Sequence, residues 1–320
     1  MTTSHLPTDY VLFVHGVKTR QEDEFCRLAS ALFHQVQASI ANPARDLRPI
    51  YFFWGNLNID AQNELKQSGL EKSDTWSDFW FRDFRTEQVL EFVGDAALYL
   101  SRHIGSEVVR KLVNDVLPVL KGTKPGDRLH LVTHSWGTVI LFDILFASRW
   151  EDASLDATSS TREIRQMVAE IRNALFGLGQ SKTIGIPLAS ISTMGSPLAL
   201  FTLLSINGNS NGQSSHQLAE NLKILLETLF NRRNKPLPWL NFAHPGDPIA
   251  YPLKGPINLV FDDNIRFVDI QDVMTTKGSC LLRPFSQRLL PLLWGGQAHG
   301  SYWENQTVAT TIGRTIALSN

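Results

Sequence analysis

The feature that most constrains the fold is the stretch HLVTHSWGTVI at residues 130–140. An apolar, β-rich run ends at Thr133 and His134 and passes directly through Ser135 into a helix-forming segment. Where a strand turns at once into a helix, the residues two before and two after the turn must be small. Gly137 meets this requirement, whereas Thr133 places a branched side chain at the other position. The stretch therefore predicts a strand–turn–helix unit with a serine at its sharpest point.

Other short apolar runs have the length and composition of buried strands. The six expected strands are Tyr10–Val14, Ile50–Trp54, Leu129–Thr133, Ala189–Met194, Trp239–Ala243 and Ile265–Ile270. Helical patterns fill the intervals: Glu22–Ser39, Thr86–Leu120 with a break near Gly105, Thr138–Ser148, Ser160–Leu175, His216–Asn231 and Thr307–Leu318. This alternation predicts an α/β fold, in which a mostly parallel central sheet is covered by helices on both faces.

The length of 320 residues suits one large domain, and no internal repeat is visible. We expect a single domain over 1–320 with cap-like insertions at about 56–85, 150–183 and 201–236. The last of these contains the Gly/Asn/Ser-rich stretch 207–215, which is typical of a mobile loop.

Charge and composition exclude several function classes. A formal net charge of −1 leaves no basic footprint for nucleic acid. The two cysteines, Cys26 and Cys280, form no disulfide framework or metal-ligand spacing. Because no metal cluster, dinucleotide-binding motif or P-loop occurs either, we expect no metal and no cofactor. The start of the chain lacks a secretory signal and no apolar run reaches about 20 residues, so the cytoplasm is the expected location; the oligomeric state stays open.

The strand–turn–helix context makes Ser135 a candidate nucleophile for acyl transfer. Such a reaction needs two backbone N–H groups to bind the oxyanion. One is expected from Trp136, directly after the serine, and the other from the loop that ends VLFVHGV at 11–17. There Gly16 lets the backbone turn close to the substrate and Val17 supplies the N–H group.

The acid and the base should follow the nucleophile in chain order. Asp247 lies in a Gly-Asp-Pro turn just after the fifth expected strand. Its competitors are Asp262, Asp263, Asp269 and Asp272. His299, in the loop sequence GGQAHGSYW, is the only histidine after Asp247 and is therefore the candidate base.

Four motifs together resemble a known family. The stretches are THSWGTVILFDIL (133–145), GSPLALF (195–201), DPIAY (247–251) and HGSYW (299–303). They resemble, in the same order, motifs of intracellular DDHD-domain phospholipases and their bacterial lipase-like relatives. The resemblance implies an α/β-hydrolase fold, hydrolysis of acyl esters with lipids among the substrates, and a triad of Ser135, Asp247 and His299. Thr133 and the small size of the chain depart from the family pattern.

Two further regions are candidates for substrate contact. Gly195 follows the fourth expected strand, where its backbone would line the pocket. The stretch WSDFWFRDF at 76–84 includes Trp76 and Trp80. It predicts either an amphipathic helix packed on the body or a lid, acyl-chain wall or membrane-facing surface.

The leading functional interpretation is a serine esterase or lipase acting on a small-molecule or lipid ester, with peripheral membrane contact left open. A thioesterase or an amidase would use the same triad chemistry. A hydrolase fold without activity, serving as an interaction module, is the alternative of a different class.

Overall fold

The computed structural model describes residues 6–40, 45–57, 59–82, 102–200, 219–261, 266–276 and 297–319, and within 83–101 only residues 86, 90, 94, 95 and 99. Six parallel strands in these segments form one sheet in the order β2-β1-β3-β4-β5-β6. They are β1 (Thr8–Val14), β2 (Asp46–Phe52), β3 (Arg128–His134), β4 (Leu188–Met194), β5 (Leu237–Ala243) and β6 (Val268–Met274). The predicted α/β fold is confirmed, and it is consistent with an α/β-hydrolase-like architecture.

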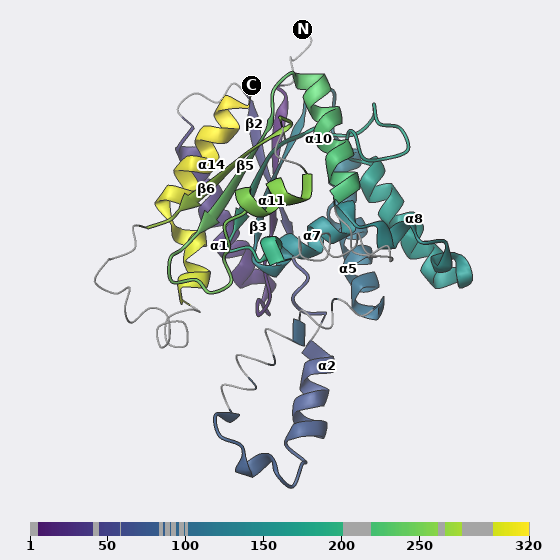
Figure 1. Ribbon diagram of the computed structural model, residues 1–320, viewed down its shortest axis with the longest axis vertical. Helices are drawn as coiled ribbons and strands as arrows, with labels where there is room; N and C mark the ends of the chain where they lie inside the picture. The colour runs from purple at the N-terminus through teal and green to yellow at the C-terminus, as the bar shows by residue number, and fades with distance from the viewer. Residues whose placement is uncertain are drawn as a thin grey trace.

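Helices cover both faces of the sheet (Figure 1). On one face, α1 (Glu22–Ala38) packs against α14 (Gln306–Leu318) over a core that includes Phe13 and Phe242. The larger core lies on the other face and takes in the alternate β1 residues Leu12 and Val14. Its covering helices are α5 (Arg102–Asp115), α6 (Leu117–Lys121), α7 (Trp136–Phe146), α8 (Ser159–Asn173), α10 (Ala219–Arg233) and α11 (Lys254–Phe261).

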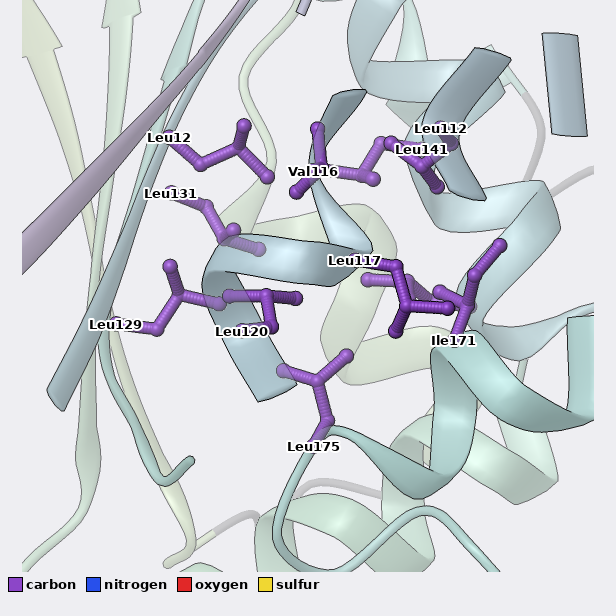
Figure 2. Close-up of a pocket in the computed structure, with 11 residues that line it drawn as sticks. Leu12, Leu112, Val116, Leu117, Leu120, Leu129, Leu131, Leu141, Ile171 and Leu175 are labelled. Atoms are coloured by element: carbon purple, nitrogen blue, oxygen red, sulfur yellow. The ribbon is translucent and has the colours of Figure 1, made fainter. Parts of the chain in front are cut away.

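The larger core is aliphatic beneath α6. Leucine, isoleucine and valine side chains from β1, β3, α5, α6, α7 and α8 converge there (Figure 2). They leave a gap of about 10 Å³. A gap of that size is at the lower limit for one water molecule, and water would find no polar partner on its lining. We therefore regard it as imperfect packing and not as a ligand site.

The strand order determines where the loops after β1 and β3 lie. The chain leaves β1 toward β2 on one side and later returns to β3 on the other side of β1. The loops after β1 and β3 therefore diverge at the carboxyl end of the sheet. In parallel α/β sheets, such a reversal is where ligands bind.

One helix differs from its prediction. The expected helix Thr86–Leu120 falls partly outside the described residues, and its described part is divided into α5 and α6. The division comes at Val116, and Gly105, where we expected it, lies inside α5. Pro118 follows the division and explains it, because proline cannot donate the backbone hydrogen bond that a continuous helix needs.

The two edge strands also lie elsewhere than predicted. We expected Ile265–Ile270 for the last strand, but β6 runs from Val268 to Met274. Its polar side chains are exposed and alternate with the buried Val268 and Ile270, so apolar runs alone misplaced it. Likewise β2 begins at Asp46, before the apolar stretch that we took for the strand. Helix α11 was not predicted.

Residues 59–82 extend away from the body, and we call them the arm (Figure 1). The arm contains α2 (Ile59–Glu64), a π-helical turn η1 (Leu65–Leu70) and a 3₁₀ turn η2 (Trp76–Asp78). It projects from the carboxyl end of the sheet, opposite the two chain termini (Figure 1).

The other two expected insertions have different outcomes. In the second, α8 packs against α5 and α7, and its Ile164, Val168 and Ile171 belong to the larger core. In the third, the stretch 207–215 lies outside the described residues, and α10 packs against α7. No helix in the described part of the chain is both long enough and apolar enough to cross a bilayer.

Candidate active site

Ser135 occupies a strained turn between β3 and α7. Its backbone has φ 53° and ψ −131°, a region that non-glycine residues rarely adopt. The Ser135 N–H donates a hydrogen bond of 2.9 Å to the Met194 carbonyl at the end of β4. The serine thus stands at the carboxyl end of the sheet and at the start of a helix whose residues 137–146 are all buried.

The residues that flank Ser135 show how the turn is packed. The Oγ1 atoms of Thr133 and Thr138 lie 2.8 Å apart, so the polar part of the unexpected Thr133 is paired across the turn. A Cβ atom on Gly137 would lie 2.0 Å from the His15 carbonyl oxygen. Only glycine allows the helix to approach the loop after β1 so closely, as the sequence motif predicts.

His299 links Ser135 to Asp247. Its Nε2 lies 2.7 Å from Ser135 Oγ, and its Nδ1 lies 2.9 Å from Asp247 Oδ2. The three residues come from the turn after β3, the loop after β5 and the segment that precedes α14. The structure therefore brings together the three side chains that the sequence selected from positions up to 164 residues apart.

Asp247 is buried and remains anionic. Burial alone would raise its pKa, but the hydrogen bond and charge of His299, together with the hydrogen bonds from the Tyr302 hydroxyl and the Ile249 N–H, outweigh burial and lower the pKa. Ile249 N–H donates to Oδ1 over 2.9 Å, while the Tyr302 hydroxyl donates to Oδ2 over 2.6 Å. A carboxylate held at both oxygens is suited to orient an imidazole.

Tyr302 is a site residue that the sequence reasoning missed, although it lies inside the HGSYW motif. Its buried hydroxyl also accepts a hydrogen bond of 2.9 Å from the His244 N–H, next to β5. Burial, with the Asp247 charge, raises the pKa of Tyr302 and keeps the phenol protonated. The usable signal was spacing, because residues three apart in a helical turn face the same side.

The two competing carboxylates that the structure describes, Asp269 and Asp272, bond elsewhere. Asp272 accepts hydrogen bonds from Asn241 Nδ2 and from the backbone N–H of Leu253 and Lys254, so it holds the loop before α11. Asp269 pairs with Gln271 on the exposed side of β6. Asp262 and Asp263 lie outside the described residues.

The loop after β1 lies directly beside Ser135. A Cβ atom on Gly16 would lie 2.5 Å from Ser135 Cβ, so glycine is required there. His15 stacks on Trp54, accepts a hydrogen bond from the Trp54 N–H at Nε2, and is bonded to the Gly16 carbonyl through Nδ1. Burial lowers the pKa of His15 to about 3, so the neutral ring orders the loop.

Asp95 clamps the other end of this loop. Lys18, which has a left-handed backbone with φ 66°, donates its N–H to Asp95 Oδ2 over 2.9 Å. Gln62 from α2 donates to Asp95 Oδ1 over 2.7 Å, and Arg20 forms an ion pair with Oδ1 at 3.0 Å. The buried Asp95 carboxylate therefore joins the loop that carries Val17 to the base of the arm.

His134 packs against His299, the candidate base. The two rings lie 4.7 Å apart, and His134 Nε2 lies 2.7 Å from the His299 carbonyl oxygen. Because a carbonyl only accepts, Nε2 is the donor. Burial lowers the pKa of His134 to about 3, so the ring is neutral. His134 therefore packs against the His299 ring and hydrogen-bonds the backbone that carries it.

The residues expected to contact substrate have different surroundings. Gly195 has φ 56°, and a Cβ atom there would lie 2.8 Å from Asp247 Oδ2 and 2.7 Å from the Tyr302 ring. It therefore makes room for the acid. The rings of Trp76 and Trp80 contact those of Phe79 and Phe81, respectively, within the arm, which extends away from the body (Figure 1).

The candidate oxyanion donors, Trp136 and Val17, each directly follow a residue of the site, Ser135 and Gly16. Trp136 is the first residue of α7 and directly follows Ser135. Val17 follows Gly16, whose Cα adjoins Ser135 Cβ. The two loops that carry these N–H groups are in contact through Gly137 and His15.

An open groove of about 770 Å³ lies at the other end of the sheet. It is lined near the starts of β3 and β4 by residues that include Gly126, Asp127 and Pro187. Both signs of charge meet there, because Lys121, Lys124 and Arg232 line it together with Glu170 and Asp127. The groove lies far from the site assembled around Ser135, and we assign it no chemistry.

Comparison with known proteins supports a phospholipase-like relationship. No protein-family model matches the chain. Among curated proteins, the chain is similar to Phospholipase DDHD1 of Mus musculus, with 29% identity over 174 residues. The matched region covers 45% of this chain and 29% of the mouse protein, so the chain spans less than a third of that relative.

Proposed function

We propose that this protein is a serine hydrolase that cleaves carboxylic esters, with lipid esters as its substrate class. The observation that carries the proposal is the continuous hydrogen-bonded series from Ser135 Oγ through His299 to Asp247 Oδ2, with distances of 2.7 and 2.9 Å. The similarity to a mouse protein named a phospholipase supports the choice of lipids.

In the proposed reaction, Ser135 Oγ attacks the ester carbonyl carbon while His299 Nε2 takes the hydroxyl proton. The N–H groups of Trp136 and Val17 stabilise the negative charge on the substrate oxygen. His299 then gives its proton to the leaving alcohol, and the acyl group stays on Ser135.

Water completes the cycle. His299 removes a proton from water as the water oxygen attacks the acyl-enzyme, and the proton returns to Ser135 Oγ when the carboxylic acid leaves. Asp247 stays ionised throughout, because its lowered pKa keeps it anionic beside the imidazolium. Its role is to hold the Nδ1–H tautomer and to stabilise the positive charge.

The decisive experiment is labelling with a fluorophosphonate probe, followed by hydrolysis of a soluble short-chain ester. We expect labelling of the wild type, none of Ser135→Ala, and a loss of roughly 10⁴-fold or more in kcat for Ser135→Ala and His299→Ala. Ser196→Ala and His34→Ala are matched controls and should label normally. Ser196 instead accepts a hydrogen bond from the Leu198 N–H, and His34 is exposed on α1.

The outcomes separate the alternatives. Labelling that persists in Ser135→Ala means that another residue is the nucleophile. Folded wild type that neither labels nor turns over any ester favours an interaction module without activity. Labelling combined with turnover of only the matching thioester or amide assigns the same triad to a different leaving group.

A further inference from the structure

The far end of the arm exposes an uninterrupted aromatic sequence. Phe79, Trp80 and Phe81 are 46%, 79% and 73% exposed. The Trp76 and Phe79 rings lie 5.7 Å apart, and those of Trp80 and Phe81 lie 6.4 Å apart. The segment is therefore not the amphipathic helix packed on the body that was one reading of the sequence, and Phe84 lies outside the described residues.

The arm has a fixed base beside the candidate active site. At that base, Gln62 and Arg20 both contact Asp95, and Arg20 Nη2 also donates to Gln62 Oε1 over 2.6 Å. Asp95 in turn receives the Lys18 N–H from the loop beside Ser135. The arm leaves the body at the carboxyl end of the sheet (Figure 1). A surface contacted by its far end therefore lies on the side where Ser135 is found.

The charges near the aromatic rings are mixed. Acidic and basic side chains both occur along 71–82: Glu71, Lys72, Asp74, Asp78 and Arg82. Within this described stretch, no cluster of positive charge would attract anionic lipid or nucleic acid. Attraction through this segment must therefore come from the aromatic side chains.

The chemistry and shape of the segment favour a lipid interface. Tryptophan and phenylalanine partition well into the boundary between lipid headgroups and acyl chains. A stable protein–protein interface usually buries about 800 Å² on each partner, spread over roughly 20 to 30 residues with complementary surfaces. Four rings at the end of a projecting arm offer much less area but can enter a lipid layer.

We propose that residues 76–81 form a lipid-docking element that inserts its aromatic side chains into the interfacial layer of a zwitterionic bilayer. This rests on the proposed function in one respect, since it would bring the active site to its lipid esters. Because insertion is apolar, binding needs no anionic lipid and changes little with salt.

The test is flotation of the full chain with phosphatidylcholine vesicles, with and without phosphatidylserine, at about 0.1 and 0.5 M NaCl. We expect the wild type to bind both vesicle types at both salt concentrations. Trp80→Ala/Phe81→Ala should weaken binding roughly tenfold or more, since two large apolar side chains no longer enter the lipid. The matched control is Ile184→Ala, which removes an apolar side chain of 65% exposure from another surface.

Three outcomes would overturn the proposal: no flotation of the wild type, equal flotation of wild type and double variant, or binding that needs phosphatidylserine and disappears at high salt. A fourth such outcome would come from sedimentation of the wild type and the double variant. If the wild type is a dimer and the variant is a monomer, the aromatic segment contacts a second copy of this chain and not lipid. Thermal unfolding confirms that the exposed substitutions leave the fold intact.

Parallel activity assays keep this test distinct from that of the proposed function. If both hold, the double variant hydrolyses a soluble short-chain ester at the wild-type rate but acts at least about tenfold more slowly on ester in vesicles. A wild type that floats but hydrolyses nothing refutes the enzyme and leaves lipid docking supported.

Discussion

Replacing Tyr302 with phenylalanine tests whether Tyr302 only holds Asp247 in place or takes a direct part in the proposed reaction. The substitution keeps the buried ring and deletes the hydroxyl, which donates to Asp247 Oδ2 over 2.6 Å and accepts the His244 N–H over 2.9 Å. A hydrogen bond to a charged, buried group contributes about 1.5 to 3 kcal/mol to stability. We expect Tyr302→Phe to reduce the free energy of unfolding at pH 7 by that amount.

The effect on turnover should be smaller than that of losing the acid. Asp247 keeps the Ile249 N–H on Oδ1 and His299 on Oδ2, so the carboxylate stays near its place. We expect kcat/KM to fall about tenfold, equivalent to about 1.4 kcal/mol in the barrier. Asp247→Asn, which loses the tautomer control, should cost roughly 10⁴-fold.

The pH dependence of the free energy of unfolding distinguishes a lost hydrogen bond to Asp247 from a packing defect, because a packing defect lowers stability equally at every pH. Because Asp247 has a lowered pKa in the folded protein, the stability it provides is complete above its ordinary pKa of about 3.9 and is lost as the pH falls through the folded value. Deleting the Tyr302 donor brings the pKa of Asp247 in the folded protein closer to its pKa in the unfolded chain. The stability gap between wild type and Tyr302→Phe should therefore be widest near neutral pH and should narrow in acid.

Urea unfolding across this pH range and steady-state kinetics on a soluble ester measure these effects. Tyr10→Phe, which removes a hydroxyl near the amino end of β1, is the matched control. The reasoning is refuted if Tyr302→Phe unfolds like the wild type, or if its loss of stability is the same at every pH. An activity loss as large as that of Asp247→Asn would assign Tyr302 a direct part in the chemistry.

Three further predictions concern the surroundings of the site. Asp95→Ala should release the Lys18 N–H and weaken binding of a boronate transition-state analogue roughly tenfold, with little change in KM. The control Gln62→Ala, which loosens only the arm, should leave that binding unchanged. Equal effects of the two substitutions would mean that Asp95 serves only to attach the arm. Burial lowers the pKa of His134 to about 3, so as the pH falls the unfolded chain binds a proton at this histidine before the folded protein does. The free energy of unfolding should therefore fall below about pH 6.5 by up to about 1.4 kcal/mol per pH unit. If the free energy of unfolding of His134→Gln falls just as steeply with pH, this reasoning is wrong. Gly195→Ala places a Cβ atom 2.8 Å from Asp247 Oδ2, and we expect a loss of about 1 to 3 kcal/mol of stability together with reduced labelling; normal labelling would show that the acid tolerates displacement.

Much of the candidate site could be predicted from sequence because its signals are local. The turn at Ser135 needs a strand, a small residue and a helix within a few positions, and all three are visible in one stretch. Asp247 and His299 follow from chain order and from their loops, since loops at the ends of parallel strands converge at one edge of a sheet. The four buried strands were identified for a similar reason, as apolar runs report burial on both faces.

What the sequence determined by itself was therefore the fold class and the residues that local patterns single out. Only the tertiary structure decided between Asp247, in the loop after β5, and Asp272, inside β6, because Asp247 contacts His299 whereas Asp272 bonds to the loop before α11. It also decided the roles of Tyr302, Asp95 and Gly195, which act through contacts with residues distant in the chain. For Tyr302, the spacing from His299 indicates a shared face but not its bond to Asp247. The contacts of Asp95 and Gly195 leave no periodicity or spacing in the sequence, since they depend on how separate elements pack.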